Sequence, residues 1–218
     1  MSAYNIGGIP LEIQPHTAHT ARLLAPFATT ATPVATLPPP PANKNEIVGL
    51  FYSLCRVMLE RFDTLYLHGP VLEYGGKGYL FTAPSGEGKS THLRLWQETV
   101  QEATILSGDK PLLRPTSTGC TVYSTPWQGK EGWGSVGHAP LAAIFVLRRG
   151  TENTVTPLSA AEALPHLFGA TWSPEDKPTY EKMLSLLDLL LQTVPVYLLT
   201  ATPTVGAVHT VKTIIDSL

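Results

Sequence analysis

The chain has 218 residues, 43% of them hydrophobic and 15% charged, and a formal net charge of −2. These values are typical of a globular protein that buries its own core, and they argue against nucleic acid as a partner because no charge excess would attract a polyanion. Cys55 and Cys120 are too few and too far apart for a zinc site, and we expect both to be reduced. The sequence shows neither a secretory signal nor an apolar run of the ~20 residues that cross a bilayer, so we expect a cytoplasmic protein with no membrane partner.

The N-terminal region is expected to hold one strand and a connector. Residues 5–13 predict a short strand, and residues 28–42 are nearly all Ala, Thr and Pro. That composition predicts an extended, polyproline-like segment without helix or sheet hydrogen bonds. We therefore predict that residues 1–42 form an added lobe or an edge strand with its connector, and that residues 43–218 form the main domain.

Helices and strands of a mixed α/β domain follow. Asn45 is a helix cap before apolar residues at helical spacing, which run from Ile47 to Phe62. Residues 64–74 and 78–83 flank Gly75-Gly76 and predict a β-hairpin, and residues 90–99 predict a helix. Further strands are expected at 103–107, 119–125, 141–147 and 194–200.

Two helices are expected near the C-terminus. The first begins at Ser173-Pro174-Glu175-Asp176, which combines a cap, a first-turn proline and acidic residues at the positive end of the helix. The inward residues of this helix are expected to be Met183, Leu184, Leu187, Leu190 and Leu191. The second helix is expected to begin at Thr202-Pro203.

The segment from Ala83 to Thr91 carries the strongest chemical signal. A P-loop has Gly, four residues and then Gly-Lys-Ser/Thr; here Ala83 replaces the first glycine and Gly88-Lys89-Ser90 is intact. Glycines let successive N–H groups turn toward an anion, and the helix that follows adds its positive end. We predict that a nucleotide triphosphate is bound by Ser85, Gly86, Glu87, Gly88, Lys89, Ser90 and Thr91. The alternative is a glycine-rich turn between strand and helix in which Lys89 binds no phosphate.

A second acidic group is expected beside this loop. Asp109 follows the apolar run 103–106, about the length of one crossover helix and a parallel strand after Lys89. Lys89 is expected to reach the β- and γ-phosphates and the Ser90 hydroxyl to coordinate Mg²⁺, while Asp109 binds Mg²⁺ through water or accepts a proton from an attacking hydroxyl. The alternative is an ordinary turn aspartate.

Four segments in order resemble the HPr kinase/phosphorylase family and its neighbour, phosphoenolpyruvate carboxykinase. They are His68-Gly69, residues 84–91, residues 105–110 and residues 125–132, and the likeness covers roughly residues 64–200. The resemblance implies a mixed β-sheet core with the P-loop between a hairpin strand and a helix, and a catalytic domain at 43–218 that uses ATP and Mg²⁺. It also implies that His68 lies near the reaction centre.

The chain departs from that family at two places. Gly108 stands where the family has the first of two adjacent aspartates, which leaves open whether the reverse reaction, phosphorolysis of a phosphoserine, occurs. The N-terminal domain of bacterial HPr kinases is replaced by some forty residues, so HPr itself is not the expected substrate. Related small kinases associated with peptide-modifying gene clusters suggest a serine on a small protein or precursor peptide.

Several residues keep two interpretations at this stage. His68 either lies near the γ-phosphate as a partner of Asp109 or simply packs. Lys130 and Glu131 lie in a glycine-flanked loop with Trp127 and Trp133; they either close over nucleotide or substrate, with Glu131 as a metal ligand, or form a solvated pair. The last two candidates are Arg148-Arg149, which clamps phosphate or is solvated, and His92, which contacts nucleotide or packs.

The sequence thus predicts an ATP- and Mg²⁺-dependent kinase that phosphorylates a hydroxyl, with Lys89, Asp109 and His68 as its catalytic residues. The metal is expected at Ser90, Asp109 and Glu131, and Lys130 and Glu131 form the candidate substrate loop. The alternatives are a small-molecule kinase or carboxykinase-like enzyme, and a non-catalytic nucleotide-binding regulator. Hexamers in the resembled family leave a homo-oligomer open.

Overall fold

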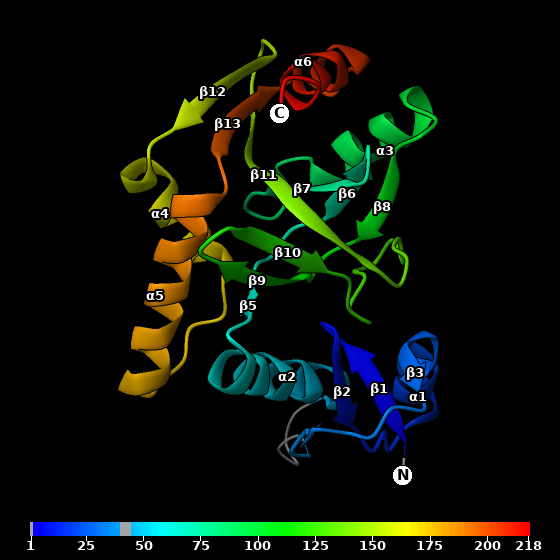
Figure 1. Cartoon of the computed structure of the whole chain (residues 1–218). Helices are drawn as coiled ribbons and strands as arrows, with labels where there is room; N and C mark the ends of the chain where they lie inside the picture. Colours follow the sequence, from blue (N-terminus) through cyan, green and yellow to red (C-terminus); the bar gives the residue numbers. More distant parts are fainter. Residues whose placement is uncertain (1, 40–44) are drawn as a thin grey trace.

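The computed structural model describes residues 2–39 and 45–218 and shows a mixed α/β fold built on two separate sheets (Figure 1). The expected fold class is therefore confirmed at the level of mixed α/β. The expected boundary after residue 42 and the end of the proline-rich run lie outside the described residues. No helix in the described ranges is both long and apolar enough to span a lipid bilayer.

The N-terminal residues form a small sheet in the order β3-β1-β2-β4. Strands β1 (Ala3–Ile6) and β2 (Ile9–Glu12) are antiparallel across Gly7-Gly8, where both φ angles are positive. The single strand expected at 5–13 is therefore wrong: two glycines in the left-handed region reverse the chain. Helix α1 (Ala18–Leu24) and a 3-10 turn, η1 (Ala25–Phe27), lead away from this hairpin.

The expected connector also joins the small sheet. Strand β3 (Ala28–Thr29) pairs with β1, and β4 (Ala35–Thr36) runs parallel to β2. The prediction of a segment without sheet hydrogen bonds is thus wrong for these four residues. Each edge strand needs only two residues with free N–H groups, and the prolines lie outside the paired positions.

Helix α2 (Glu46–Phe62) packs against the small sheet and begins at Asn45 as expected. The Asn45 side chain accepts a hydrogen bond from the Ile47 N–H at 3.0 Å. One hydrophobic core joins the sheet to α2 and to a distant loop; its members include Ile6, Leu11, Leu50, Phe51, Met58 and Trp127. The N-terminal strands are therefore buried against the rest of the protein through α2.

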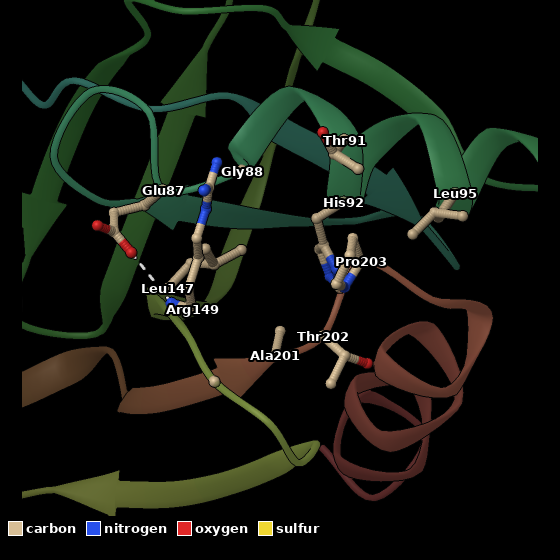
Figure 2. Close-up of a pocket in the computed structure, with 11 residues that line it drawn as sticks. Glu87, Gly88, Thr91, His92, Leu95, Leu147, Arg149, Ala201, Thr202 and Pro203 are labelled. Carbon is tan, nitrogen blue, oxygen red and sulfur yellow. Dashed lines mark hydrogen bonds between the residues drawn. The ribbon is translucent and has the colours of Figure 1, made fainter.

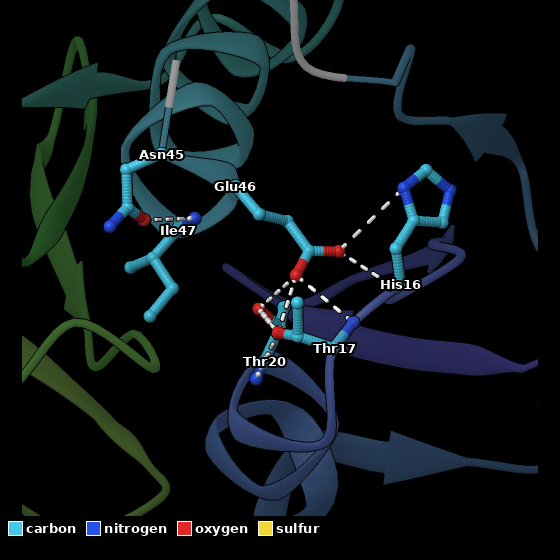
Figure 3. Close-up of polar contacts among 6 residues, drawn as sticks. All are labelled: His16, Thr17, Thr20, Asn45, Glu46 and Ile47. Atoms are coloured by element: carbon cyan, nitrogen blue, oxygen red, sulfur yellow. Dashed lines mark hydrogen bonds and ion pairs between the residues drawn. The ribbon is translucent and has the colours of Figure 1, made fainter. Parts of the chain in front are cut away.

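Glu46 ties the start of α2 to the start of α1 (Figure 3). Its carboxylate accepts hydrogen bonds from the hydroxyls of Thr17 and Thr20, each at 2.6 Å, and from the backbone N–H groups of His16 and Thr17. Burial alone would raise the pKa of Glu46, but these hydrogen bonds outweigh it and lower the pKa to about 2. The ionised carboxylate thus caps α1 from the neighbouring helix.

The main sheet curls around β11 (His138–Arg149), the longest strand. The strand order is β5-β9-β10-β11-β7-β6-β8. Strand β13 pairs with the C-terminal half of β11, and β12 pairs with β13. The bounds of the other strands are β5 (Leu65–Tyr66), β6 (Val71–Tyr74), β7 (Lys77–Thr82), β8 (Thr104–Ser107), β9 (Leu112–Thr116), β10 (Gly119–Tyr123), β12 (Thr154–Leu158) and β13 (Val196–Ala201). Strands β7, β11 and β13 are parallel, whereas β10, β6 and β12 run antiparallel to their neighbours.

Helices cover both faces of the main sheet (Figure 1). Helices α3 (Lys89–Thr99) and α6 (Val205–Ile215) bury Leu93, Trp96 and Val208 on one face. Helices α4 (Ala160–Ala170) and α5 (Lys177–Thr193) bury Leu167 and Leu187 on the other. The sequence predicted α3, the β6–β7 hairpin and β11, whereas β9, β12 and α4 were not predicted.

The two C-terminal helices begin later than expected. Helix α5 starts after Asp176, whose side chain accepts a hydrogen bond from the Thr179 N–H at 3.0 Å, so the cap expected at Ser173 is wrong. Helix α6 starts after Thr204. Leu184 is 38% exposed and Leu186 takes a buried position instead, because the packing of α5 against α4, β9 and α2 sets which face turns inward.

Candidate active site

The glycine-rich loop at 83–88 connects β7 to α3. Gly86 and Gly88 have φ values of 89° and 105°, which a residue with a Cβ rarely adopts. The ammonium of Lys89 donates hydrogen bonds to the carbonyl oxygens of Ala83 at 2.7 Å and Pro84 at 3.2 Å. Burial lowers the pKa of Lys89, although Asp109 and Glu87 act in the opposite direction. The loop thus carries a partly desolvated cation at its open side.

The end of β11 fastens this loop to the sheet. The backbone N–H of Arg149 donates to the Glu87 carboxylate at 3.0 Å, which Figure 2 marks with a dashed line, and the Arg149 guanidinium donates to the Gly86 carbonyl at 2.5 Å. Arg148 instead donates to the Thr200 hydroxyl at 3.1 Å. Of the two arginines that the sequence singled out, only Arg149 therefore reaches the loop.

His68 and Asp109 form a close pair beside the loop. The His68 Nε2 atom lies 3.0 Å from Asp109 Oδ1. The backbone holds this pair in place, because the Gly69 N–H donates to the Asp109 carbonyl at 2.8 Å and the His68 N–H donates to the Ala170 carbonyl at 2.7 Å. A Cβ at Gly69 would lie 2.3 Å from the Phe81 carbonyl oxygen, so only glycine allows this close approach to β7.

The order of the strands explains how Asp109 reaches the loop. The spacing predicted one crossover helix and a parallel strand between Lys89 and Asp109, but the two strands are not neighbours: β6 lies between β7 and β8. Both β7 and β8 are antiparallel to β6, so they run in the same direction. Their C-terminal ends meet at the same edge of the sheet, which brings Asp109 to the glycine-rich loop.

A second loop, residues 127–134, lies over the end of β8. Gly108 donates its N–H to the Gln128 side-chain oxygen at 2.6 Å, and a Cβ on Gly108 would lie 2.4 Å from the carbonyl oxygens of Gln128 and Trp133. A Cβ on Gly129 would lie 3.0 Å from the Asp109 Cβ. The close backbone contact explains why position 108 is glycine here.

The two tryptophans of this second loop have structural contacts. Trp127 is buried, donates its indole N–H to the Ile47 carbonyl at 3.1 Å and packs against Phe51. Trp133 lies under the Arg94 guanidinium, 5.9 Å from its ring centre. Trp127 thus anchors the loop to α2.

These elements surround a cavity of about 400 Å³, here called the loop cavity. Nearly all the residues expected at the site line it, namely His68, Ser85, Gly86, Gly88, Lys89, Ser90, Thr91, Asp109, Lys130 and Glu131. The structure adds Gly108, Gln128, Gly129 and Arg149 to the lining. The sequence analysis had left the role of Arg149 open and had given the other three no role at the site. Gln128 and Gly129 had one signal, their place inside the segment 125–132 that carried the family resemblance.

Oxygen ligands suited to Mg²⁺ also lie around the loop cavity. The Ser90 hydroxyl and the carboxylates of Asp109 and Glu131 all line it, and these are the hard ligands that Mg²⁺ takes together with phosphate oxygens. Lys130 and Glu131 lie 3.8 Å apart. Within residues 2–39 and 45–218, no group of three or more His, Cys, Asp or Glu side chains is arranged to hold a metal ion.

A neighbouring cavity of about 330 Å³, here called the β13 cavity, shares Gly88, Thr91 and Arg149 with the loop cavity; Figure 2 shows its lining. It lies between α3, the end of β11 and the turn from β13 to α6, and Leu95, Leu147, Ala201 and Pro203 give it an apolar lining. His92 belongs to this lining and is buried, which lowers its pKa to about 4. Its Nε2 accepts the Trp96 indole N–H at 3.0 Å, so that nitrogen is already engaged in packing α3.

Comparisons with known proteins add a distant likeness. No protein-family profile matches the chain, and no curated protein sequence matches it. Among solved structures the chain is similar to the Hpr(Ser) kinase/phosphatase from Coxiella burnetii, with a TM-score of 0.40 and 11% identity over 70% of this chain and 88% of that one. The roles of the site residues therefore depend on the geometry described above.

Proposed function

We propose that this protein is an ATP- and Mg²⁺-dependent kinase that transfers the γ-phosphoryl group to the hydroxyl of a serine on a small protein or precursor peptide. One observation carries the proposal: a single cavity gathers the glycine-rich loop, the Lys89 ammonium and the His68–Asp109 pair. Phosphoryl transfer needs mainly positioning and charge stabilisation, and these groups supply both.

The glycine-rich loop is the proposed binding site of the phosphates. Gly86 and Gly88 have the positive φ angles that turn successive N–H groups to one side, and α3 begins directly after them. Lys89 is held on the Ala83 and Pro84 carbonyls within the same loop, and a phosphate oxygen is a stronger partner for its ammonium than a neutral carbonyl. Arg149 adds a second cation beside the loop.

Ser90 and Asp109 are the proposed ligands of Mg²⁺, with Glu131 as a further candidate, and the bound ion would supply positive charge to the phosphate oxygens. Asp109 has a second role as the group that orients the acceptor and takes the proton of its hydroxyl. The new bond joins the acceptor oxygen to the γ-phosphorus, and the bond from that phosphorus to the β–γ bridging oxygen breaks. His68 holds the Asp109 carboxylate in place from 3.0 Å.

The β13 cavity is the proposed site of the nucleobase. It shares Gly88, Thr91 and Arg149 with the loop cavity, so a nucleotide whose phosphates occupy the loop has its base beside it. Its lining is mainly apolar, which suits the flat face of a purine ring. This adjacency favours a nucleoside triphosphate over inorganic polyphosphate.

Incubation of the purified protein with γ-labelled ATP and Mg²⁺, alone and with serine-containing peptides, tests the proposal. We expect label on a peptide for the wild type and none for Lys89→Ala. ATP binding without any turnover would instead favour a non-catalytic nucleotide-binding regulator, and absence of ATP binding would contradict the proposal altogether.

A further inference from the structure

A third cavity, of about 440 Å³, borders the glycine-rich loop on the side that faces α4, and we call it the α4 cavity. It lies between the end of β7, the loop start at Ala83 and Pro84, and the C-terminal half of α4. His68 and Ser85 line both the α4 cavity and the loop cavity. The two cavities therefore meet at the His68–Asp109 pair.

The α4 cavity leads to the groups that matter for phosphoryl transfer. Two of its lining residues, Ala83 and Pro84, supply the carbonyls that hold the Lys89 ammonium at 2.7 and 3.2 Å. His68 lies in its wall and contacts Asp109 at 3.0 Å. A group that enters through this cavity therefore arrives next to His68, the partner of Asp109, without crossing the β13 cavity.

The chemistry of the lining limits what can enter. The residues that line it are His68, Thr82, Ala83, Pro84, Ser85, Val146, Pro165, His166, Gly169 and Ala170, and none of these described residues is Lys, Arg, Asp or Glu. A carboxylate, phosphate or ammonium group would lose its hydration there without gaining an opposite charge, which is costly. The lining therefore favours an uncharged occupant.

Exposed apolar side chains also lie on α4 outside the cavity lining. Leu164 and Phe168 on α4 are 39% and 37% exposed, and Phe168 contacts Tyr180 of α5 edge to face, with ring centres 6.3 Å apart. Leu184 on α5 is 38% exposed. An occupant that only filled the cavity would leave these side chains in water, whereas a chain passing over α4 would cover them.

Building on the proposed kinase function, we propose that the α4 cavity receives the acceptor: a hydroxyl-bearing residue of a peptide segment whose flanking residues are uncharged and apolar. The hydroxyl passes between His68 and Ser85 toward Asp109, which takes its proton as the new oxygen–phosphorus bond forms. The flanking residues pack on Leu164 and Phe168.

Gly169 offers a direct test because a Cβ there meets no atom within 4 Å, so a larger side chain fits without a clash. Gly169→Phe and, as a second variant, His166→Trp should fill the α4 cavity. Ala161→Phe is the matched control, since Ala161 is an exposed α4 residue outside the cavity lining. Each variant is first checked for an unchanged circular dichroism spectrum and for ATP affinity within about twofold of wild type.

The probes are γ-labelled ATP with Mg²⁺ and short peptides that carry a central serine flanked by leucine and alanine, by lysine or by glutamate. We expect wild type to prefer the apolar flanks, and both cavity-filling variants to lose about tenfold or more of kcat/KM for that peptide while Ala161→Phe does not. Preference for charged flanks, or an equal effect of all three variants, would overturn the inference while transfer of label to a peptide still supported the kinase. Absence of ATP binding and turnover would instead overturn the proposed function, and this inference with it.

Discussion

Gly108 donates its backbone N–H to the side-chain oxygen of Gln128 across 2.6 Å, and the space for a side chain at position 108 is taken by the 127–134 loop to which Gln128 belongs. In the family that the sequence resembles, the matching position is an aspartate. The contact shows that an acidic side chain here would require the 127–134 loop to move. The absence of a side chain at Gly108 therefore allows the 127–134 loop to pack against the end of β8.

Substitution of Gly108 should accordingly destabilise the protein. Since a Cβ would lie 2.4 Å from two backbone carbonyl oxygens, we expect Gly108→Ala to lower the free energy of unfolding by about 1–3 kcal/mol. Gly108→Asp should destabilise further and should not increase activity. Urea denaturation measures the effect, and Gly169→Ala, where the added Cβ meets open space, is the control. A Gly108→Asp protein as stable as wild type would contradict this account.

Asp109→Asn should separate binding from transfer. The amide keeps the size of the side chain but cannot accept the hydroxyl proton, so we expect ATP affinity within about threefold of wild type and kcat lower by about 10²–10⁴-fold. His68→Ala should lower kcat with little change in KM for ATP, because His68 acts by holding Asp109. Equal losses of ATP affinity and transfer in Asp109→Asn would instead mean that Asp109 acts mainly as a metal ligand or a folding residue and not as the proton acceptor; Asp188→Asn on α5 serves as the control.

Lys89→Ala should abolish turnover without lowering stability. Removing one preorganised cation from the proposed phosphate site should cost about 10²–10³-fold in kcat or more. Folding lowers the pKa of Lys89, so at neutral pH its charged form costs the folded state free energy, and the variant should have a Tm equal to or above that of wild type. Single-turnover kinetics and thermal melts measure the two effects, with exposed Lys177→Ala as the control. Near-wild-type turnover would rule out the proposed mechanism.

Ala201→Leu should weaken ATP binding but not the binding of inorganic tripolyphosphate. The side chain would fill the β13 cavity, in whose lining Ala201 lies (Figure 2), while the loop cavity is unchanged. We expect wild type to bind ATP about tenfold or more tighter than tripolyphosphate, and the variant to lose that difference. Isothermal titration calorimetry measures both ligands. If the binding of ATP and of tripolyphosphate were weakened equally, the adenine base would have to bind outside the β13 cavity.

Glu46→Gln should weaken the attachment of the N-terminal sheet at neutral pH. The carboxylate accepts hydrogen bonds from Thr17, Thr20 and two backbone N–H groups (Figure 3), and we expect a loss of about 1–2 kcal/mol. The folded pKa of about 2 lies below the ordinary value of 4.5, so this stabilisation is present above pH 4.5 and is lost as the pH falls toward 2.

Urea denaturation across that pH range checks the Glu46 prediction. The difference in the free energy of unfolding between wild type and Glu46→Gln should become smaller as the pH falls from 4.5 toward 2. Glu181→Gln, at an exposed ion pair on α5, should show almost no difference at any pH. If the loss of unfolding free energy in Glu46→Gln stayed constant with pH, the shape of the side chain, and not its ionised carboxylate, would be what matters at this position.

The sequence by itself determined the local features. The turn at Gly75-Gly76, the cap at Asn45 and the positive φ angles of Gly86 and Gly88 follow from neighbouring residues, because steric limits and short-range hydrogen bonds act within a few positions. Buried β11 followed from its apolar run. The weakly patterned segments were harder: two-residue edge strands such as Ala35–Thr36 exist only because β2 offers them partners.

Only the tertiary structure decided how the candidate site is assembled. The insertion of β6 between β7 and β8 sets the edge at which Asp109 meets the glycine-rich loop, and the pairing of Asp109 with His68 depends on it. The hydrogen bonds of Arg149 to the loop and of Gln128 to Gly108 likewise join residues far apart in the chain. Such contacts depend on the order and direction of strands, which the packing of the whole sheet fixes and no local pattern encodes.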